Sequence, residues 1–423
     1  MSWFYIILLI EVFAFLYLRF LYFFLLTLAL ILYGFSQIRY SLKILPLLLI
    51  SYVQGVKTEV VTELKDIKKM MQLNDKGRGV ECLFSQEGFS PMLSLESENG
   101  PNWERLRENY LTFFSYTPSL GKFAFIANQE VKRILALPDN IDSIQISKST
   151  VKIFLSWLFC ENHLKLEKKE NITFSKVEPE EVRPDDLKFV EQFVNDDVFT
   201  KLYESSLEYR KHLAIKGKAD PAKKQYAVDV VVDILSKSKY TSIPNFNWKD
   251  PFIFSIVMQP MIISPMINIS DIAVGVKRHK DLYNKKDYKE FLDYIDYCIM
   301  KNHPFVVLER YNKETNTQYY LEIDTFHKAS TFDPTILNYA MGPRACLGRV
   351  IARIFLEHFF QPIVEDMTKF YPEVNHLYSG RDNDDNMSFQ ETIYQVTKIF
   401  GVIFKEYLRA RRENNQIIES KDN

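Results

Sequence analysis

The first 35 residues constrain the fold most, because residues 3–35 are almost wholly apolar and carry only two charged side chains, Glu11 and Arg19. A helix over about residues 12–35 would cross a hydrocarbon core of about 30 Å, since each helical residue rises about 1.5 Å. Arg19 would then lie in the outer half of the span and reach toward the headgroups. A cleaved signal peptide fits less well, because neither a basic leading region nor a small-residue cleavage site is visible. The sequence therefore predicts an N-terminal membrane anchor at residues 1–35.

The charges around this span predict its orientation. Three basic residues follow it, and none precedes Arg19; the three are Arg39, Lys43 and Lys57. The positive-inside rule places such a flank in the cytoplasm. We therefore expect a single-pass membrane protein in contact with membrane lipid, with a basic and apolar linker at residues 36–57 and the bulk of the chain on the cytoplasmic side. The apolar run 44–53 is too short to span, and it is either an interfacial foot or an ordinary buried segment.

The remainder has the composition of a well-filled, mostly helical protein. Of 423 residues only 13 are glycine and 14% are aromatic, and the formal net charge of −1 gives no electrostatic case for nucleic acid. Helical patterns are expected at residues 103–114, 126–137, 149–160, 185–215, 220–237, 287–300 and 345–366. Two β-like runs, 305–310 and 318–325, flank a polar stretch and predict one hairpin. We therefore expect a mainly α fold with a small β component.

The C-terminal region also predicts a helix. Ser388 and Glu391 form a capping box before an apolar-periodic run, and the last dozen residues are polar. The predicted domain order is an anchor at 1–35, a linker at 36–57, a folded domain at 58–412 and a polar tail at 413–423.

The four cysteines are widely spaced: Cys82, Cys160, Cys298 and Cys346. None lies in a C-x-x-C pair, so the spacing argues against a zinc site. It also suggests no disulfide framework, which is typical of a chain exposed to the reducing cytosol.

One of these cysteines lies in a specific context, because residues 339–352 read YAMGPRACLGRVIA and a helical pattern follows. This stretch resembles the haem-binding loop of the cytochrome P-450 family, F-x-x-G-x-R-x-C-x-G-x-x-x-A, and departs from it only at Tyr339. The resemblance implies a cytochrome P-450 fold behind the anchor, with a haem whose iron is bound by the thiolate of Cys346. The competing interpretation is a structural cysteine flanked by glycines at a loop–helix junction.

The residue types in this stretch suit that chemistry. Backbone N–H groups at a helix N-terminus stabilise a thiolate such as that of Cys346, and the thiolate donates electron density to haem iron. Gly342 and Gly348 would let the backbone approach the porphyrin, and Arg344 would pair with a haem propionate. With Tyr339 in the place of the family's phenylalanine, these residues form the predicted cofactor contacts of the loop.

A second resemblance lies upstream, in residues 100–107, which read GPNWERLR. They are similar to the family's W-x-x-x-R helix, here with Asn102 as the expected helix cap. Trp103 and Arg107 are four residues apart and would share one helix face, and in the family this pair reaches a haem propionate. The spacing alone is weak, because an amphipathic surface helix produces it readily.

A third resemblance is degenerate. The family has an E-x-x-R helix followed by His-Pro, and here Cys298 and Lys301 stand in place of the Glu and the Arg before His303. Cys298 cannot form that ion pair, and Lys301 lacks the fork geometry of arginine. Arg310 falls near the position of an arginine that touches haem in the family. The resemblance therefore implies a cofactor contact from Arg310 and a lost structural pair.

The fourth family feature is missing. Oxygen-activating members carry an acid–threonine pair that relays protons, in a central helix over the haem. The corresponding residues 251–273 contain no threonine, and two prolines there predict a broken or kinked helix. Ser264 and the reversed pair Ser270 and Asp271 are the available candidates for a substitute relay. A helix cap or turn is the simpler interpretation of Ser270 and Asp271.

The resemblance implies a membrane-anchored haem-thiolate oxidoreductase, a divergent and shortened monooxygenase acting on a small apolar substrate of the sterol or fatty acid class. An electron-donating reductase would then dock on the basic face near the cysteine through Arg349 and Arg353; the alternative is that these two arginines are solvated helix charges. The missing threonine favours a first alternative, a peroxide-using or hydroperoxide-rearranging enzyme. The lost E-x-x-R pair favours a second, a catalytically degenerate haem- or lipid-binding membrane protein.

Overall fold

The computed structural model describes residues 49–79, 82, 95, 98–169, 177–193, 221–284, 291–301, 307–323, 338–372, 401 and 403–412. The chain divides into two units, one of residues 57–382 and one that joins residues 1–56 to residues 383–423. The predicted anchor at 1–35 and most of the predicted linker lie outside the described residues. The larger unit ends before the predicted domain boundary at residue 412, because the C-terminal segment belongs with the segment that precedes residue 57.

The smaller unit contains two described helical segments, residues 49–53 and 403–412. Gln54 Nε2 donates to Glu406 Oε1 at 3.0 Å, and Glu406 also pairs with Arg409. The predicted C-terminal helix is therefore present over its described part, whereas its predicted capping box lies outside the described residues.

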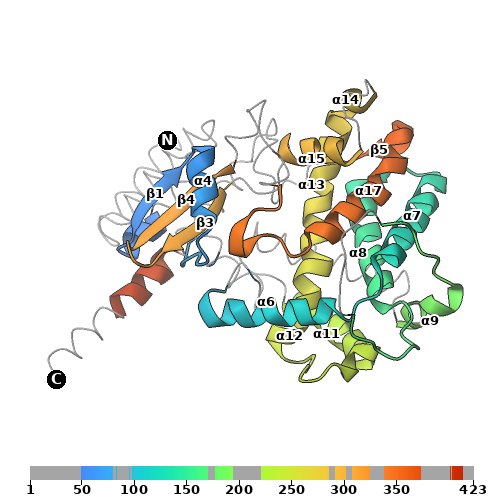
Figure 1. Ribbon diagram of the computed structural model, residues 1–423, viewed down its shortest axis with the longest axis horizontal. Helices are drawn as coiled ribbons and strands as arrows, with labels where there is room; N and C mark the ends of the chain where they lie inside the picture. Colours follow the sequence, from blue (N-terminus) through green and yellow to red (C-terminus); the bar gives the residue numbers. More distant parts are fainter. Residues whose placement is uncertain are drawn as a thin grey trace, which may run out of the picture. The chain divides into compact units, whose positions relative to one another are not determined.

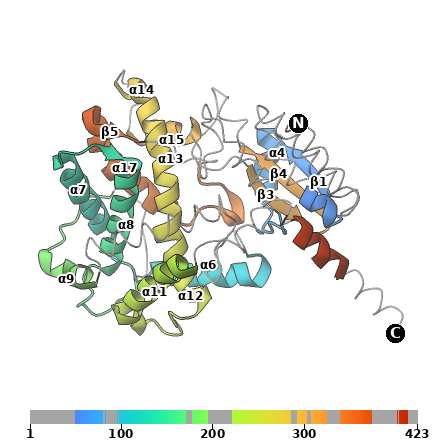
Figure 2. The ribbon, with the colours of Figure 1, turned by 180° about the vertical axis from the view of Figure 1, so that it is seen from behind.

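The larger unit is mainly helical, and five helices build its core. These are α7 (Leu120–Ala136), α8 (Ser143–Phe159), α13 (Ser264–Arg278), α15 (Phe291–Lys301) and α17 (Arg349–Glu365). Helix α13 packs on α8, α17 packs on α7, and α15 packs on both α13 and α17 (Figure 1). The same contacts can be followed from behind in Figure 2. The expected mainly α architecture is confirmed.

Aromatic side chains fill the centre of this helical core. Phe355 and Phe359 of α17 stack with ring centroids 4.8 Å apart, and Phe355 also stacks on Phe154 of α8 at 5.9 Å. Phe123 of α7 meets Phe154 edge-on at 5.0 Å. Burying one such side chain contributes about 1.5–3 kcal/mol, so the cluster ties α7, α8 and α17 together.

The remaining helices surround this core. They are α4 (Leu64–Met70), α6 (Gly100–Phe114), α9 (Pro184–Phe193), α11 (Pro221–Lys237), α12 (Pro251–Val257) and α14 (Lys280–Asn284), with 3₁₀ turns at η2 (Lys239–Ser242), η5 (Gly342–Arg344) and η6 (Met367–Lys369). Helix α6 begins at Gly100, so the prediction that Asn102 caps it is wrong. The residue before the helix, Asn99, instead bonds to Lys76: its Oδ1 accepts from the Lys76 backbone N–H at 2.9 Å. Proline at the second helical position suits the early start, because the first helical N–H groups have no intrahelical acceptor.

The segment in which two prolines predicted a broken or kinked helix continues without a break through a π-helical stretch. Between α12 and α13 lies a π-helical stretch, η3 (Met258–Ile263), which absorbs Pro260, while Pro265 falls in the first turn of α13. A π-turn lets the chain continue past a residue that lacks an N–H donor. Among the described residues, Pro251–Arg278 is the helix long and apolar enough to cross a membrane, but 65% of its apolar window is buried, as in a core helix.

Two small sheets complete the larger unit. The first has the order β1 (Lys57–Val61), β4 (Thr317–Glu322), β3 (Val307–Asn312), and the second pairs β2 (Ile141–Asp142) with β5 (Phe370–Tyr371). Strands β3 and β4 are antiparallel, which confirms the predicted hairpin, whereas β1 pairs with β4 in parallel. Strand β1 was not predicted: only its first residue, Lys57, lay in the predicted linker, and the strand with which it pairs is distant in the sequence. Its pairing starts the folded unit at Lys57.

Candidate cofactor site

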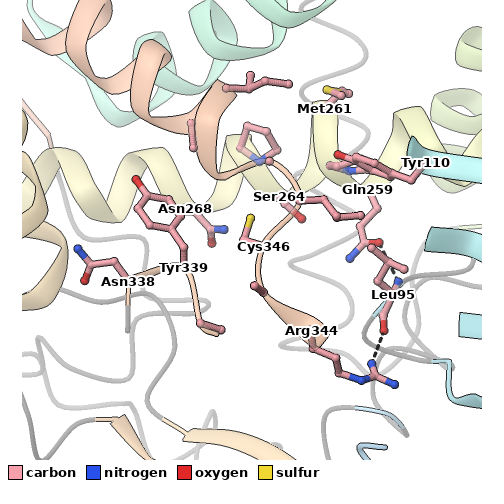
Figure 3. A pocket seen from close by; sticks show the side chains of 18 of the residues that line it. Leu95, Tyr110, Gln259, Met261, Ser264, Asn268, Asn338, Tyr339, Arg344 and Cys346 are labelled. Carbon is pink, nitrogen blue, oxygen red and sulfur yellow. Dashed lines mark hydrogen bonds between the residues drawn. The ribbon is translucent and has the colours of Figure 1, made fainter. Parts of the chain in front are cut away.

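A cavity of about 280 Å³ lies between α6, the helix α12–η3–α13, strand β3 and the start of α17 (Figure 3). All but one of the predicted cofactor residues line it, although they come from three distant parts of the sequence. They are Trp103, Arg107, Arg310, Tyr339, Arg344, Cys346 and Gly348. The convergence follows from the fold, because α6, β3 and the loop before α17 each present one short segment to the same space.

The cysteine loop is a tight turn that leads into α17. The backbone N–H of Cys346 donates to Tyr339 O at 2.9 Å, and that of Ala345 donates to Gly342 O at 3.0 Å. Cys82, Cys160 and Cys298 are buried, whereas Cys346 is exposed, and its exposure is to this cavity. Cys346 is therefore the cysteine whose sulfur a ligand in the cavity can reach.

The thiol of Cys346 experiences opposing electrostatic effects. Burial among protein atoms raises its pKa, whereas hydrogen bonds from the backbone N–H groups of Gly348 and Arg349 and the charge of Arg349 lower it. Those two N–H groups belong to the N-terminus of α17, where a helix favours negative charge. A cation in contact with the sulfur would add to the stabilisation of the thiolate.

The two glycines of the loop lie in different surroundings, which give different reasons for a residue without a side chain. Gly342 has φ +72°, and a Cβ there would lie 2.4 Å from the backbone O of Met71. Gly342 is not among the residues that line the cavity, and what requires a glycine there in this structure is the positive φ and the close approach to Met71. Gly348 does line the cavity, and the one heavy atom near an added Cβ would be Cys346 Sγ at 3.9 Å.

Arg344 differs from the expectation that its guanidinium is available to a propionate. Its Nη1 donates to Leu95 O and its Nη2 to Glu98 O, each at 2.9 Å, and the same Nη2 donates to Asn99 Oδ1 at 2.9 Å. Its Nε donates to the backbone O of Asn74. Since a guanidinium has five N–H donors, most are already engaged, and Arg344 clamps the loop to segments that precede α6 in the chain.

Arg107 fits the predicted role better. Its guanidinium lies over the Trp103 ring at 5.4 Å, and Arg344 lies over the same ring at 4.7 Å. Among the described residues no hydrogen bond or ion pair engages the Arg107 side chain, and burial lowers its pKa. A half-buried cation without a partner is destabilising, so this position favours an anion in the cavity.

Two further cations on the wall are almost fully buried. Arg310 of β3 is 1% exposed, and Lys76 is 3% exposed. Arg310 Nη1 donates to the backbone O of Glu309 at 2.7 Å. With Arg107 and Arg344 they give the cavity four cationic side chains, whereas its described lining residues include no Asp and no Glu.

The rest of the wall is apolar or neutral. The apolar lining comprises Phe154, Met261, Ile269, Ile272, Ile299, Leu308, Ile351, Phe355 and Leu356. Three neutral polar residues of the helix α12–η3–α13 also line the cavity: Gln259, Ser264 and Asn268 (Figure 3). Gln259 is engaged, since its Oε1 accepts from the Leu95 N–H at 3.1 Å. Ser264 and Asn268 are one turn apart and so lie on one face of α13.

The structure does not bring the nominated relay residues Ser270 and Asp271 to the cavity. Both are buried, at 0% and 1% exposed, and neither is among the described residues that line the space. Ser270 Oγ shares a hydrogen bond with Ser147 Oγ at 2.8 Å, which ties α13 to α8. Their nomination as catalytic residues is therefore not supported by their position, and Ser264 is the sequence candidate that does face the cavity.

Sequence reasoning missed several polar lining residues, among them Lys76, Tyr110 and Asn268. The i, i+4 spacing from Ser264 would have identified Asn268, and the helical spacing from Arg107 places Tyr110 on an adjacent part of the same face. No local pattern marks Lys76, which reaches the cavity through the pairing of its own segment with the N-cap residue of α6.

No protein-family model and no curated protein matches this sequence. Solved structures that resemble the fold include cytochrome P450 EryK from S. erythraea, at 10% identity and a TM-score of 0.45, covering 77% of this chain and 84% of that one. A cytochrome P450 from Picrophilus torridus has 12% identity, a TM-score of 0.42 and coverages of 73% and 88%. One from Sulfolobus tokodaii has 14% identity, a TM-score of 0.41 and coverages of 73% and 86%. These structures are from the family that the cysteine loop resembles, but similarity at this level does not define a ligand or an activity.

Proposed function

We propose that this cavity binds a haem through the thiolate of Cys346 and that the protein is a haem-thiolate oxidoreductase. One observation carries the proposal: the thiol of Cys346 and four cationic side chains line a cavity whose other described lining residues are apolar or neutral, with no carboxylate. Arg107 is a half-buried cation with no hydrogen bond or ion pair among the described residues, so it favours an anion, and a thiolate favours a cation; the cavity therefore suits a ligand that supplies both. A haem has an apolar body, two carboxylates and a central cation.

The chain's own residues would divide this task. Cys346 would hold the iron, with its thiolate stabilised by the N-terminal N–H groups of α17. Arg107 would bind a propionate, because its guanidinium is positioned by Trp103 and has no other described partner. Arg310 and Lys76 would provide further positive charge. The apolar walls, including Phe154 and Phe355, would exclude water from the porphyrin faces.

When bound, the haem would supply the oxidising chemistry of a monooxygenase, acting on a small apolar substrate of the sterol or fatty acid class. Helix α13 would form the opposite wall, where Ile269 and Ile272 contact an apolar substrate. Ser264 and Asn268 would donate or accept hydrogen bonds there, but neither side chain ionises near neutral pH. They can orient a proton donor and cannot serve as its acid.

The neutral α13 wall is the observation that favours an enzyme that uses peroxide or rearranges a hydroperoxide. Such chemistry needs neither external electrons nor net external protons, because the peroxide already carries both, so it tolerates the lack of a carboxylate on this wall. The two candidates differ in reductase dependence. Comparing product formed per electron from a reductase with product formed from added peroxide separates them, and tight coupling with the reductase would reject the peroxide candidate.

Membrane attachment and a reductase partner complete the proposal. The apolar residues 3–35 would anchor the chain with its bulk in the cytoplasm, and carbonate extraction should leave the full chain in the membrane pellet. Arg349 is exposed at the start of α17 and would contribute to a reductase surface. Arg353 is less suited to that surface, because its guanidinium pairs with Asp296.

The haem content of the purified protein tests the proposal. The chain would be expressed with a haem precursor, and haem would be measured after conversion to the pyridine complex. We expect close to one haem per chain in the wild type and in Cys82→Ala. A wild-type protein that folds but retains no haem would favour a non-enzymatic lipid-binding protein over both enzymes.

A further inference from the structure

Asp296 lies beside the cysteine loop, although no sequence motif includes it. Its side chain is 2% exposed on α15, and it forms an ion pair with Arg353 of α17. Asn338 Nδ2 donates to the backbone O of Asp296 at 2.9 Å and lies 3.5 Å from its Oδ1. Asn338 and Arg353 are on opposite sides of Cys346 in the chain. A single residue of α15 therefore contacts both ends of the segment that carries the thiol.

The burial of this carboxylate makes its partners important. Burial raises the pKa of Asp296, and the charge and hydrogen bond of Arg353 oppose that rise. A buried ion pair adds little net stability, but removal of one partner leaves an uncompensated charge in the interior. Such pairs therefore fix an arrangement more than they stabilise a fold. Here the pair fixes how α15 is placed against Asn338, where the cysteine loop begins, and against the first turns of α17.

Helix α15 is also where the expected charged pair is missing. Cys298 is fully buried, and Lys301 lies at the end of the helix with its Nζ 5.6 Å from the centre of the Tyr297 ring. Neither residue can reproduce the carboxylate–guanidinium geometry of an E-x-x-R pair. Asp296 and Arg353 do combine a carboxylate with a guanidinium, but the two groups come from different helices.

We propose that Asp296 is a positioning residue that fixes the loop of Cys346 through Asn338 and Arg353, in place of the pair that Cys298 and Lys301 cannot form. Any effect of Asp296 on haem binding rests on the proposed function. The positioning of the loop by Asp296 does not, because it concerns contacts within the chain.

Hydrogen–deuterium exchange of the full haem-free chain measures this positioning directly. In Asp296→Ala we expect the amides of residues 342–353 to exchange at least about tenfold faster, because the variant loses the ion pair with Arg353 and the 3.5 Å contact of Asn338 with Oδ1, and keeps only the bond from Asn338 to the backbone O of residue 296. Peptides from α7 should exchange at the wild-type rate. Asp296→Glu should recover most of the protection, and Asp293→Asn, on the exposed side of α15, should leave it unchanged. If Asp296→Ala does not fold, Asp296→Asn makes the same comparison with the shape retained and the charge removed.

A spectroscopic signature extends the test to the loaded protein. We expect Asp296→Ala to lower the fraction of ferrous–carbon monoxide complex with the red-shifted Soret band of thiolate ligation, and Asp296→Glu to restore it. Unchanged loop exchange in Asp296→Ala, or equal acceleration in α7, would overturn the positioning role. A wild-type chain without haem would reject the proposed function, and the exchange experiment would still decide the role of Asp296.

Discussion

The two walls of the cavity differ in what they present to a ligand. The wall formed by the cysteine loop and α17 carries the thiol of Cys346. Next to it lie two cationic side chains, Arg107 and Arg344, which we call the cationic corner. The facing wall, formed by residues 259–272, carries only apolar and neutral polar side chains among its described lining residues. The first wall has what is needed to hold a charged cofactor. The second has no acidic side chain among its described lining residues, so under the proposed function cofactor binding and reactivity would depend on different walls.

The largest effect should come from a residue that belongs to both the cavity wall and the core. Phe355→Ala should lower the free energy of unfolding by about 3–5 kcal/mol, because it removes a fully buried ring stacked on Phe154 and Phe359. Urea denaturation measures this loss. Leu111→Ala is the control, since Leu111 is 54% exposed and its truncation should change stability by about 0.5 kcal/mol or less. Equal losses in the two variants would contradict the packing described for this wall.

The next effect tests the cationic corner. Arg107→Met should weaken haem binding by about 10–100-fold, because a charge-assisted hydrogen bond to a carboxylate is worth about 1.5–3 kcal/mol. Titration of the haem-free chain with haem gives the affinity. Arg105→Met is the matched control on the same helix, since Arg105 is 54% exposed and pairs with Asp250 at 3.2 Å. A similar loss in both variants would show that the effect is not specific to the cavity.

A pair of glycine variants sharpens the account of the loop. Gly342→Ala should destabilise the protein by about 1–3 kcal/mol, because the positive φ and the approach to Met71 O both oppose a Cβ. Gly100→Ala has a comparable φ of +57° but no atom within 4 Å of the added carbon, so its cost should be about 1 kcal/mol or less. Thermal unfolding of both variants compares them. Equal costs would mean that the contact with Met71 contributes nothing.

The smallest effect on binding should come from the facing wall. Asn268→Leu should change haem affinity by less than about threefold, equivalent to about 0.6 kcal/mol, because Asn268 offers neither charge nor a ligand atom for iron. The same variant should alter the ratio of peroxide-supported to reductase-supported product. Haem titration and the two product assays measure these effects separately. A tenfold loss of haem affinity would show that the walls do not divide binding from reactivity as described.

Much of the thiolate wall was predictable from sequence because its determinants are local. A glycine, an arginine and a cysteine at fixed spacing before a helix define the loop, and Trp103 and Arg107 share a helix face. In the structure these residues line one cavity. What local patterns did not reveal were the partners supplied by other segments. Arg344 is engaged by carbonyls near residues 95 and 98, and Lys76 enters the site from outside any motif.

The facing wall was harder to predict because its geometry depends on a local change of helix type. Two prolines indicated a broken helix, but a π-helical stretch accommodates Pro260 and the helix continues. The π-helical stretch sets which face of α13 is turned to the cavity. That face carries Ser264 and Asn268, whereas Ser270 packs against α8. The β1 strand was missed for a related reason, since its pairing with β4 is nonlocal.

The absorption spectrum of the reduced protein with carbon monoxide tests the central claim most directly. We expect the wild type to show the red-shifted Soret band of thiolate-ligated haem. Cys160→Ala should keep the band, because Cys160 is buried away from the cavity. Cys346→Ala should abolish it. A band that persists in Cys346→Ala, or a wild-type protein that binds haem without it, would contradict the assignment of Cys346 as the ligand.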